Sequence, residues 1–131
     1  MGVVEAFRKA VEAGDHETIR ELLADDVVFT SPVAFKPYPG KAVTAAILRH
    51  VSEVFQDFTY IREINDGPEH ALVFRAWVNG KELQGCDFIH VNAEGKISDF
   101  TVMVRPLSAA MALSEAMAER FPQIVREVTG E

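Results

Sequence analysis

Apolar residues recur at helical spacing in three stretches of the first half of the chain, which predicts three helices. The sets are Val3, Phe7, Ala10 and Val11; Ile19, Leu22 and Leu23; and Val43, Ile47, Val51 and Val54. Gly14 is placed to end the first helix, and Asp15 to cap the second. A fourth helix is predicted from Ser108, as its N-cap, to Arg120, because Pro122 should end it.

Between these helices the pattern changes to that of strands. A short strand is predicted at residues 27–29 and longer ones at 58–64, 71–78, 83–91 and 97–104. Asp66-Gly67, Asn79-Gly80 and Glu94-Gly95 separate the four longer strands, and such pairs are typical of hairpin turns between antiparallel neighbours. Prolines and a glycine in residues 32–40 indicate a loop. Helices followed by a meander predict an α+β fold with a mainly antiparallel sheet.

The strand at 71–78 is apolar on both sides. Its alternation puts Phe74 on one face of the sheet, and Arg75 and Trp77 on the other, outer face. The three helices can cover only the first face. We therefore expect a homodimer through the outer sheet face.

Composition narrows the classes of function. The 131 residues fit one domain, residues 1–131, with a net charge of −7 that argues against nucleic acid as a partner. No apolar run is long enough to cross a membrane, and the charged N-terminus does not resemble a secretory signal. The single cysteine, Cys86, favours the cytoplasm. Four scattered histidines give no metal-ligand spacing, so no metal or cofactor is expected.

Asp87 is the candidate for chemistry, because it interrupts an otherwise apolar strand. A buried carboxylate without a partner is costly, so the group should be protonated, paired or partly exposed. A protonated acid in a dry pocket can donate a hydrogen bond to a carbonyl oxygen. The alternative is a structural acid whose hydrogen bonds are satisfied by a neighbour or by water.

Three segments, residues 7–15, 24–33 and 87–97, resemble the nuclear transport factor 2-like superfamily, and within it the SnoaL-like and ketosteroid isomerase-like proteins. The resemblance implies a cone-shaped curved sheet packed against three N-terminal helices, with an apolar cavity inside. The predicted C-terminal helix is extra to the isomerases and could cap the cavity mouth or extend a dimer.

The catalytic set of the isomerases is only partly present. Phe7 stands where the resemblance places a Tyr hydroxyl, and Ser31 stands where it places the base Asp; Asp87 alone is retained. Without a base, steroid isomerisation is not expected. Ser31 could instead contact a ligand or simply form the turn before Pro32. The Arg that related epoxide hydrolases carry two residues before this Asp is replaced by Gly85.

The resemblance implies a ligand pocket lined by Phe7, Phe29, Ser31, Phe74, Asp87, Ile89, Phe100, Val102 and Val104. We expect a small apolar ligand, with Asp87 as its main polar contact. One alternative is an isomerase, cyclase or dehydratase that uses Asp87 as acid or oxyanion donor. The other is a dimeric protein-interaction module with a filled cavity.

Overall fold

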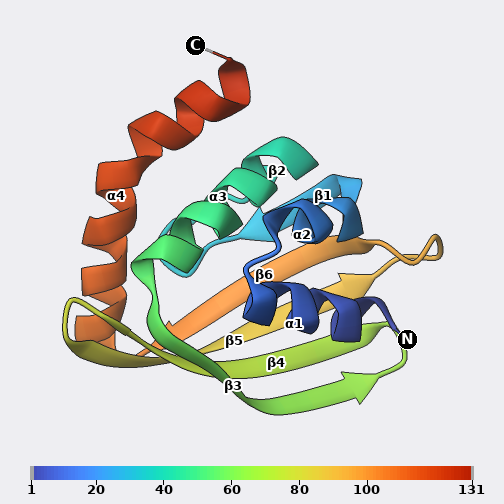
Figure 1. The fold of residues 1–131 in the computed structure, drawn as a ribbon, viewed down its shortest axis with the longest axis horizontal. Coiled ribbons are helices and arrows are strands. Elements are labelled where there is room, and N and C mark those ends of the chain that lie inside the picture. The colour runs from blue at the N-terminus through green and yellow to red at the C-terminus, as the bar shows by residue number, and fades with distance from the viewer. Residues whose placement is uncertain (1, 131) are drawn as a thin grey trace.

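The computed structural model of the chain describes residues 2–130, in which helices pack against one curved sheet around a single core (Figure 1). The helices are α1 (Val3–Ala13), α2 (His16–Leu22), α3 (Lys41–Val54) and α4 (Leu107–Thr129). The strands are β1 (Leu23–Thr30), β2 (Tyr38–Pro39), β3 (Gln56–Asp66), β4 (Glu69–Val78), β5 (Lys81–Val91) and β6 (Ile97–Arg105). No helix among the described residues is long and apolar enough to cross a membrane.

The strands form one curved sheet in the order β2-β1-β6-β5-β4-β3. All neighbours are antiparallel except β1 and β6, which run parallel. Helices α1, α2 and α3 lie on one face of the sheet, and α4 runs along one side of the molecule (Figure 1). The predicted α+β class and helix-covered, mainly antiparallel sheet are confirmed.

Helix α1 ends, and helix α2 begins, where the sequence predicts. Gly14 adopts the left-handed conformation, with φ of 69°, that closes α1. The Asp15 carboxylate accepts a hydrogen bond from the Thr18 backbone N–H at 3.1 Å and so caps α2. These local signals depend only on neighbouring residues, which explains why they could be predicted from sequence.

Three predicted boundaries, one at β1 and two at α4, are wrong. Strand β1 begins at Leu23, where the sequence indicated a helix. Helix α4 begins at Leu107, with Pro106 as its N-cap in place of Ser108, and continues through Pro122 to Thr129. Proline lacks a backbone donor, yet the helix continues past it, and Ile124, two residues further on, is fully buried in the core.

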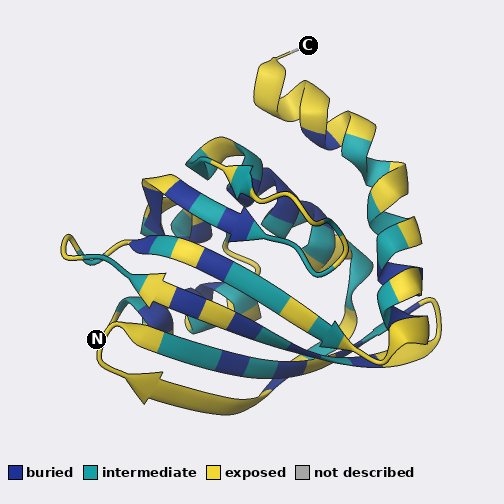
Figure 2. Cartoon of the chain, turned by 180° about the vertical axis from the view of Figure 1, so that it is seen from behind, coloured by how far each residue is buried: buried dark blue, intermediate teal, exposed yellow. Residues whose placement is uncertain are grey.

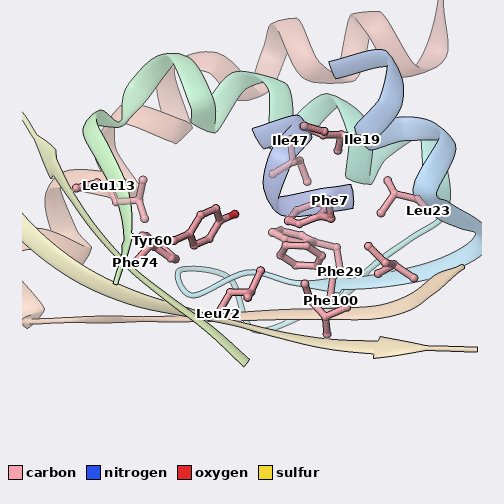
Figure 3. Packing of buried hydrophobic residues seen from close by; sticks show 14 of the residues in the cluster. Phe7, Ile19, Leu23, Phe29, Ile47, Tyr60, Leu72, Phe74, Phe100 and Leu113 are labelled. Atoms are coloured by element: carbon pink, nitrogen blue, oxygen red, sulfur yellow. The ribbon is translucent and has the colours of Figure 1, made fainter. Parts of the chain in front are cut away.

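The core lies between the helical layer and the concave face of the sheet (Figures 2 and 3). Alternate residues of β4 and β5 point into it, and the burial of Leu72, Phe74, Leu83 and Ile89 follows that alternation. The intervening residues face outward, among them Arg75 and Trp77, whose side chains stack with the guanidinium 5.5 Å from the ring centroid. The concave face is therefore the one on which a site can form.

Candidate functional site

A cavity of about 480 Å³ opens between the concave face of the sheet and the helices. Its walls come from all four helices, from all six strands and from the loop after β1. Most of the lining side chains are aromatic or aliphatic. Few polar groups therefore interrupt its wall, and each can be considered in turn.

Two aromatic clusters form opposite parts of this wall. In the first, Phe100 packs against Phe7 and Phe29, with ring centroids 5.4 and 5.7 Å apart. In the second, Phe74 packs against Phe55 and Phe58, at 5.5 and 4.9 Å. Aromatic side chains are rigid and present wide flat surfaces. The cavity is therefore shaped for an apolar ligand with flat parts.

Asp87 lies on the concave face of β5, paired with Leu72 of β4 and Val102 of β6. Its residue is only 6% exposed, and its carboxyl group has no hydrogen bond or ion pair with another described residue. Burial alone raises its pKa to about 8. At neutral pH the carboxyl group is therefore mostly protonated, and its O–H can donate into the cavity.

Gly85 explains how Phe74 comes to lie beside this acid. The two residues are cross-strand partners, and the Phe74 ring covers the place where a side chain on Gly85 would be. Any larger residue at position 85, including the Arg of the epoxide hydrolase pattern, would collide with the ring. The glycine thus opens room for an aromatic wall two residues from Asp87.

Tyr60 adds a second polar group to the cavity wall. Its ring is buried among the core residues with its hydroxyl directed toward Phe7 (Figure 3). Burial, and secondly the nearby charge of Asp87, raises the pKa of Tyr60, so this hydroxyl stays protonated. On the far side the Arg8 guanidinium lies 5.3 Å from the ring centroid.

Tyr60 was not among the predicted site residues, although a signal existed. Phe58 and Tyr60 are the alternate aromatic residues of β3 and the least exposed part of that strand. A period of two predicts that both point to the concave face. The sequence could have placed a phenol in the cavity by this alternation.

The remaining polar lining groups are a histidine, His16, and hydroxyls that include Ser31. The Ser31 Oγ accepts a hydrogen bond from the Val33 backbone N–H at 3.1 Å, which is the turn role, and its own proton is left free to donate. Among residues 2–130, no group of three or more His, Cys, Asp or Glu side chains could hold a metal ion.

Seven of the nine predicted pocket residues lie on the cavity wall: Phe7, Phe29, Ser31, Phe74, Asp87, Phe100 and Val102. The other two, Ile89 and Val104, do not line it. Ile89 is buried in the core further along β5, and Val104 packs against the core from β6. Both residues share a sheet face with the lining residues, but strand alternation carries no information on where along that face the cavity ends.

The C-terminal helix contributes a wall that the prediction did not include. Leu113, Met117 and Phe121 of α4 line the cavity, and the Phe121 ring lies 5.8 Å from that of Tyr38. The helix therefore forms one side of the cavity.

Comparison with known proteins agrees with this architecture. The SnoaL-like domain model matches residues 4–100. No curated protein matches the chain significantly.

Solved structures give closer matches. A steroid delta-isomerase of Pseudomonas aeruginosa is 39% identical, with 94% of this chain and 91% of that chain covered and a TM-score of 0.89. A bacterial protein with a cystatin-like fold from Silicibacter pomeroyi is 37% identical, covering 90% and 84%, with a TM-score of 0.87. An NTF2-like protein of Cytophaga hutchinsonii, 18% identical, covers 79% and 88% at a TM-score of 0.63 and shows the fold alone. The chain belongs to the SnoaL-like family and has a nuclear transport factor 2-like fold.

Proposed function

We propose that the protein binds a small, uncharged, apolar molecule in this cavity and that Asp87 donates a hydrogen bond to a carbonyl or hydroxyl oxygen of that molecule. The observation that carries the proposal is a mostly protonated carboxyl group, without a partner among the described residues, in a largely apolar cavity of about 480 Å³. The cavity of about 480 Å³ supports a binding role over the alternative of an interaction module with a filled cavity. The cytoplasm is the location we expect for this binding.

The preference for a neutral ligand follows from electrostatics. A cationic ligand would favour the ionised form of Asp87, but it would itself have to lose its water in a largely apolar cavity. An anionic ligand would lose its water as well and would meet no Lys or Arg side chain among the described residues of the wall. A neutral molecule with one oxygen atom avoids both costs and satisfies the carboxyl proton.

Matched probes can test this preference. We expect 4-alkylphenols and alkyl phenyl ketones to bind, by calorimetry at pH 6.5, and 4-alkylbenzoates of equal size to bind much more weakly. Asp87→Asn keeps an N–H donor and should retain binding, whereas Asp87→Leu should weaken it about tenfold, the value of one lost hydrogen bond. Asp99→Asn, at an exposed position of β6, is the control. Equal affinity of Asp87→Leu for the phenols, or no binding by the wild-type protein, would contradict the proposal.

A second candidate function is acid–base catalysis on a carbonyl compound. It is favoured by the 39% identity to a protein described as a steroid delta-isomerase. Asp87 and Tyr60 would donate hydrogen bonds to the carbonyl oxygen, and His16 carries the one imidazole on the cavity wall. In an isomerisation the base removes a proton from the carbon beside the carbonyl and returns it to the far end of the double bond.

Turnover separates this candidate from simple binding. A β,γ-unsaturated ketone, steroid or non-steroid, should gain the absorbance of the conjugated product. Asp87→Asn should still bind the ketone yet lose turnover, and His16→Gln should lose turnover as well. Unchanged turnover in Asp87→Asn would remove Asp87 from the mechanism. Binding without turnover in the wild-type protein would leave the binding function alone.

A further inference from the structure

Helix α4 is attached to α3 by a cluster of polar side chains centred on His50. His50 is buried, with only 1% of the residue exposed. Both nitrogens of its ring contact side chains of α4. Its Nε2 lies 3.0 Å from Oε2 of Glu127, and its Nδ1 lies 3.3 Å from Nη1 of Arg120. Because Arg120 can only donate, Nδ1 is the acceptor, and Nε2 donates to the carboxylate of Glu127.

Further ion pairs surround this histidine. Arg120 also pairs with Glu53 of α3 at 3.1 Å, and Arg49 of α3 pairs with Glu127. A buried imidazole is costly when its nitrogens are unpaired. The ring has both partners only while α4 lies at this position on α3, so His50 fixes the position of the second half of α4.

The cavity wall on α4 lies between its two attachments. Ala109 and Ala112 are buried at the start of the helix, and Ile124 and Glu127 contact the body of the protein near its end. Met117 and Phe121 lie between these points and line the cavity, while the opposite side of the helix is exposed (Figure 2). Any movement of α4 relative to α3 therefore moves these two side chains.

We propose that Met117 and Phe121 determine the length of the ligand that the cavity accepts, and that His50 is the positioning residue that holds them in place by fixing α4 on α3. This inference rests on the proposed binding function. It assigns ligand size to a helix that lies beyond the residues matched by the family model, which end at position 100.

A homologous series of probes tests the size of the cavity. We expect affinity for 4-alkylphenols to rise with chain length in the wild-type protein and then to fall when the chain meets α4. Met117→Ala and Phe121→Ala should move that maximum to longer chains. The shortest alkylphenol that is too long for the wild-type protein should bind these variants about tenfold more tightly than it binds the wild-type protein. Met111→Ala, on the exposed side of the same helix, is the matched control and should not move it.

The positioning role has a separate readout. His50→Leu should broaden the dependence on chain length and increase amide hydrogen exchange across residues 113–121, whereas His50→Gln, whose amide keeps a donor for Glu127, should do so less. If the probes bind and Met117→Ala and Phe121→Ala keep the chain-length maximum of the wild-type protein, the inference about ligand length is overturned and the proposed binding function is not. Binding of no probe by any variant would overturn the proposed function, and unchanged exchange in His50→Leu would overturn the positioning role whether or not a probe binds.

Discussion

The ring of Phe74 lies over Gly85, its partner on the neighbouring strand. A Cβ placed on Gly85 would meet Cε1 of Phe74 at 2.8 Å, and other carbons of the ring are closer still. Carbon atoms pack at about 3.5–4.0 Å, so no side chain fits there without moving the ring. This one contact fixes an aromatic wall of the cavity beside Asp87.

Gly85→Ala should therefore destabilise the protein by about 1–3 kcal/mol, the usual cost of overpacking a core. The measurement is urea unfolding of the variant beside the wild-type protein. Phe74→Leu supplies the control, because the smaller side chain removes the collision. We expect the double variant Gly85→Ala/Phe74→Leu to be more stable than the sum of the two single changes predicts; strict additivity would show that the contact is not the cause.

The buried acid should make the wild-type protein less stable at high pH. The folded-state pKa of Asp87, about 8, lies above its ordinary value of 3.8, so the folded state binds the proton more tightly. Its contribution is therefore constant below about pH 4, falls by up to about 1.4 kcal/mol per pH unit between pH 4 and 8, and is constant again above pH 8. Subtracting the unfolding free energy of Asp87→Asn from that of the wild-type protein across this range should reveal the slope. A flat difference would mean that the carboxyl group is not desolvated.

Ligand affinity should follow the same proton. Above pH 8 the Asp87 carboxylate can no longer donate, so affinity for an alkyl phenyl ketone should fall as the pH rises through about 8. The ketone does not titrate, which leaves the protein as the source of any change. Calorimetry from pH 6 to 10 measures it, with Asp87→Asn as the variant that should show no fall. A pH-independent affinity in the wild-type protein would separate binding from Asp87.

Thr44 lies fully buried on α3, and its hydroxyl oxygen has no hydrogen-bond partner among the described residues. An unpaired buried hydroxyl costs about 1–3 kcal/mol. Thr44→Val keeps the shape of the side chain without that group, so it should raise the unfolding free energy by about 1 kcal/mol. Thr44→Ser keeps the hydroxyl and loses the methyl group, and it should lower stability. A loss of stability in Thr44→Val would indicate that the hydroxyl is satisfied in solution.

We also expect the chain to dimerise through the outer face of the sheet. Phe88 and Met103 are 43% and 60% exposed on the adjacent strands β5 and β6. Apolar side chains grouped on an open sheet face are typical of an interface. Sedimentation at micromolar concentration should show a dimer, and Met103→Lys should weaken it while Lys81→Ala, at the start of β5, should not. A wild-type monomer would exclude this interface.

The sequence alone was sufficient for the class of fold and for most of its elements. The alternation of Leu72 and Phe74 with Arg75 and Trp77 assigned each side chain to a face, and the Asp66-Gly67, Asn79-Gly80 and Glu94-Gly95 pairs marked the turns. These signals are local, since they arise from backbone geometry and from the period of each element. The orientation of Asp87 toward the cavity was instead implied by the resemblance to the isomerases, since these local signals do not show which face of the sheet is hollow.

Only the tertiary structure decided how far the cavity extends and which groups share it. Ile89 and Val104 have the right periodicity but pack into the core, whereas Tyr60 and Met117 reach the cavity from β3 and α4. The extension of α4 past Pro122 likewise depends on contacts between residues far apart in the chain, such as His50 and Glu127. Periodicity records which face of an element is apolar, but the void itself is set by how the faces of distant elements meet, and that is a property of packing in three dimensions.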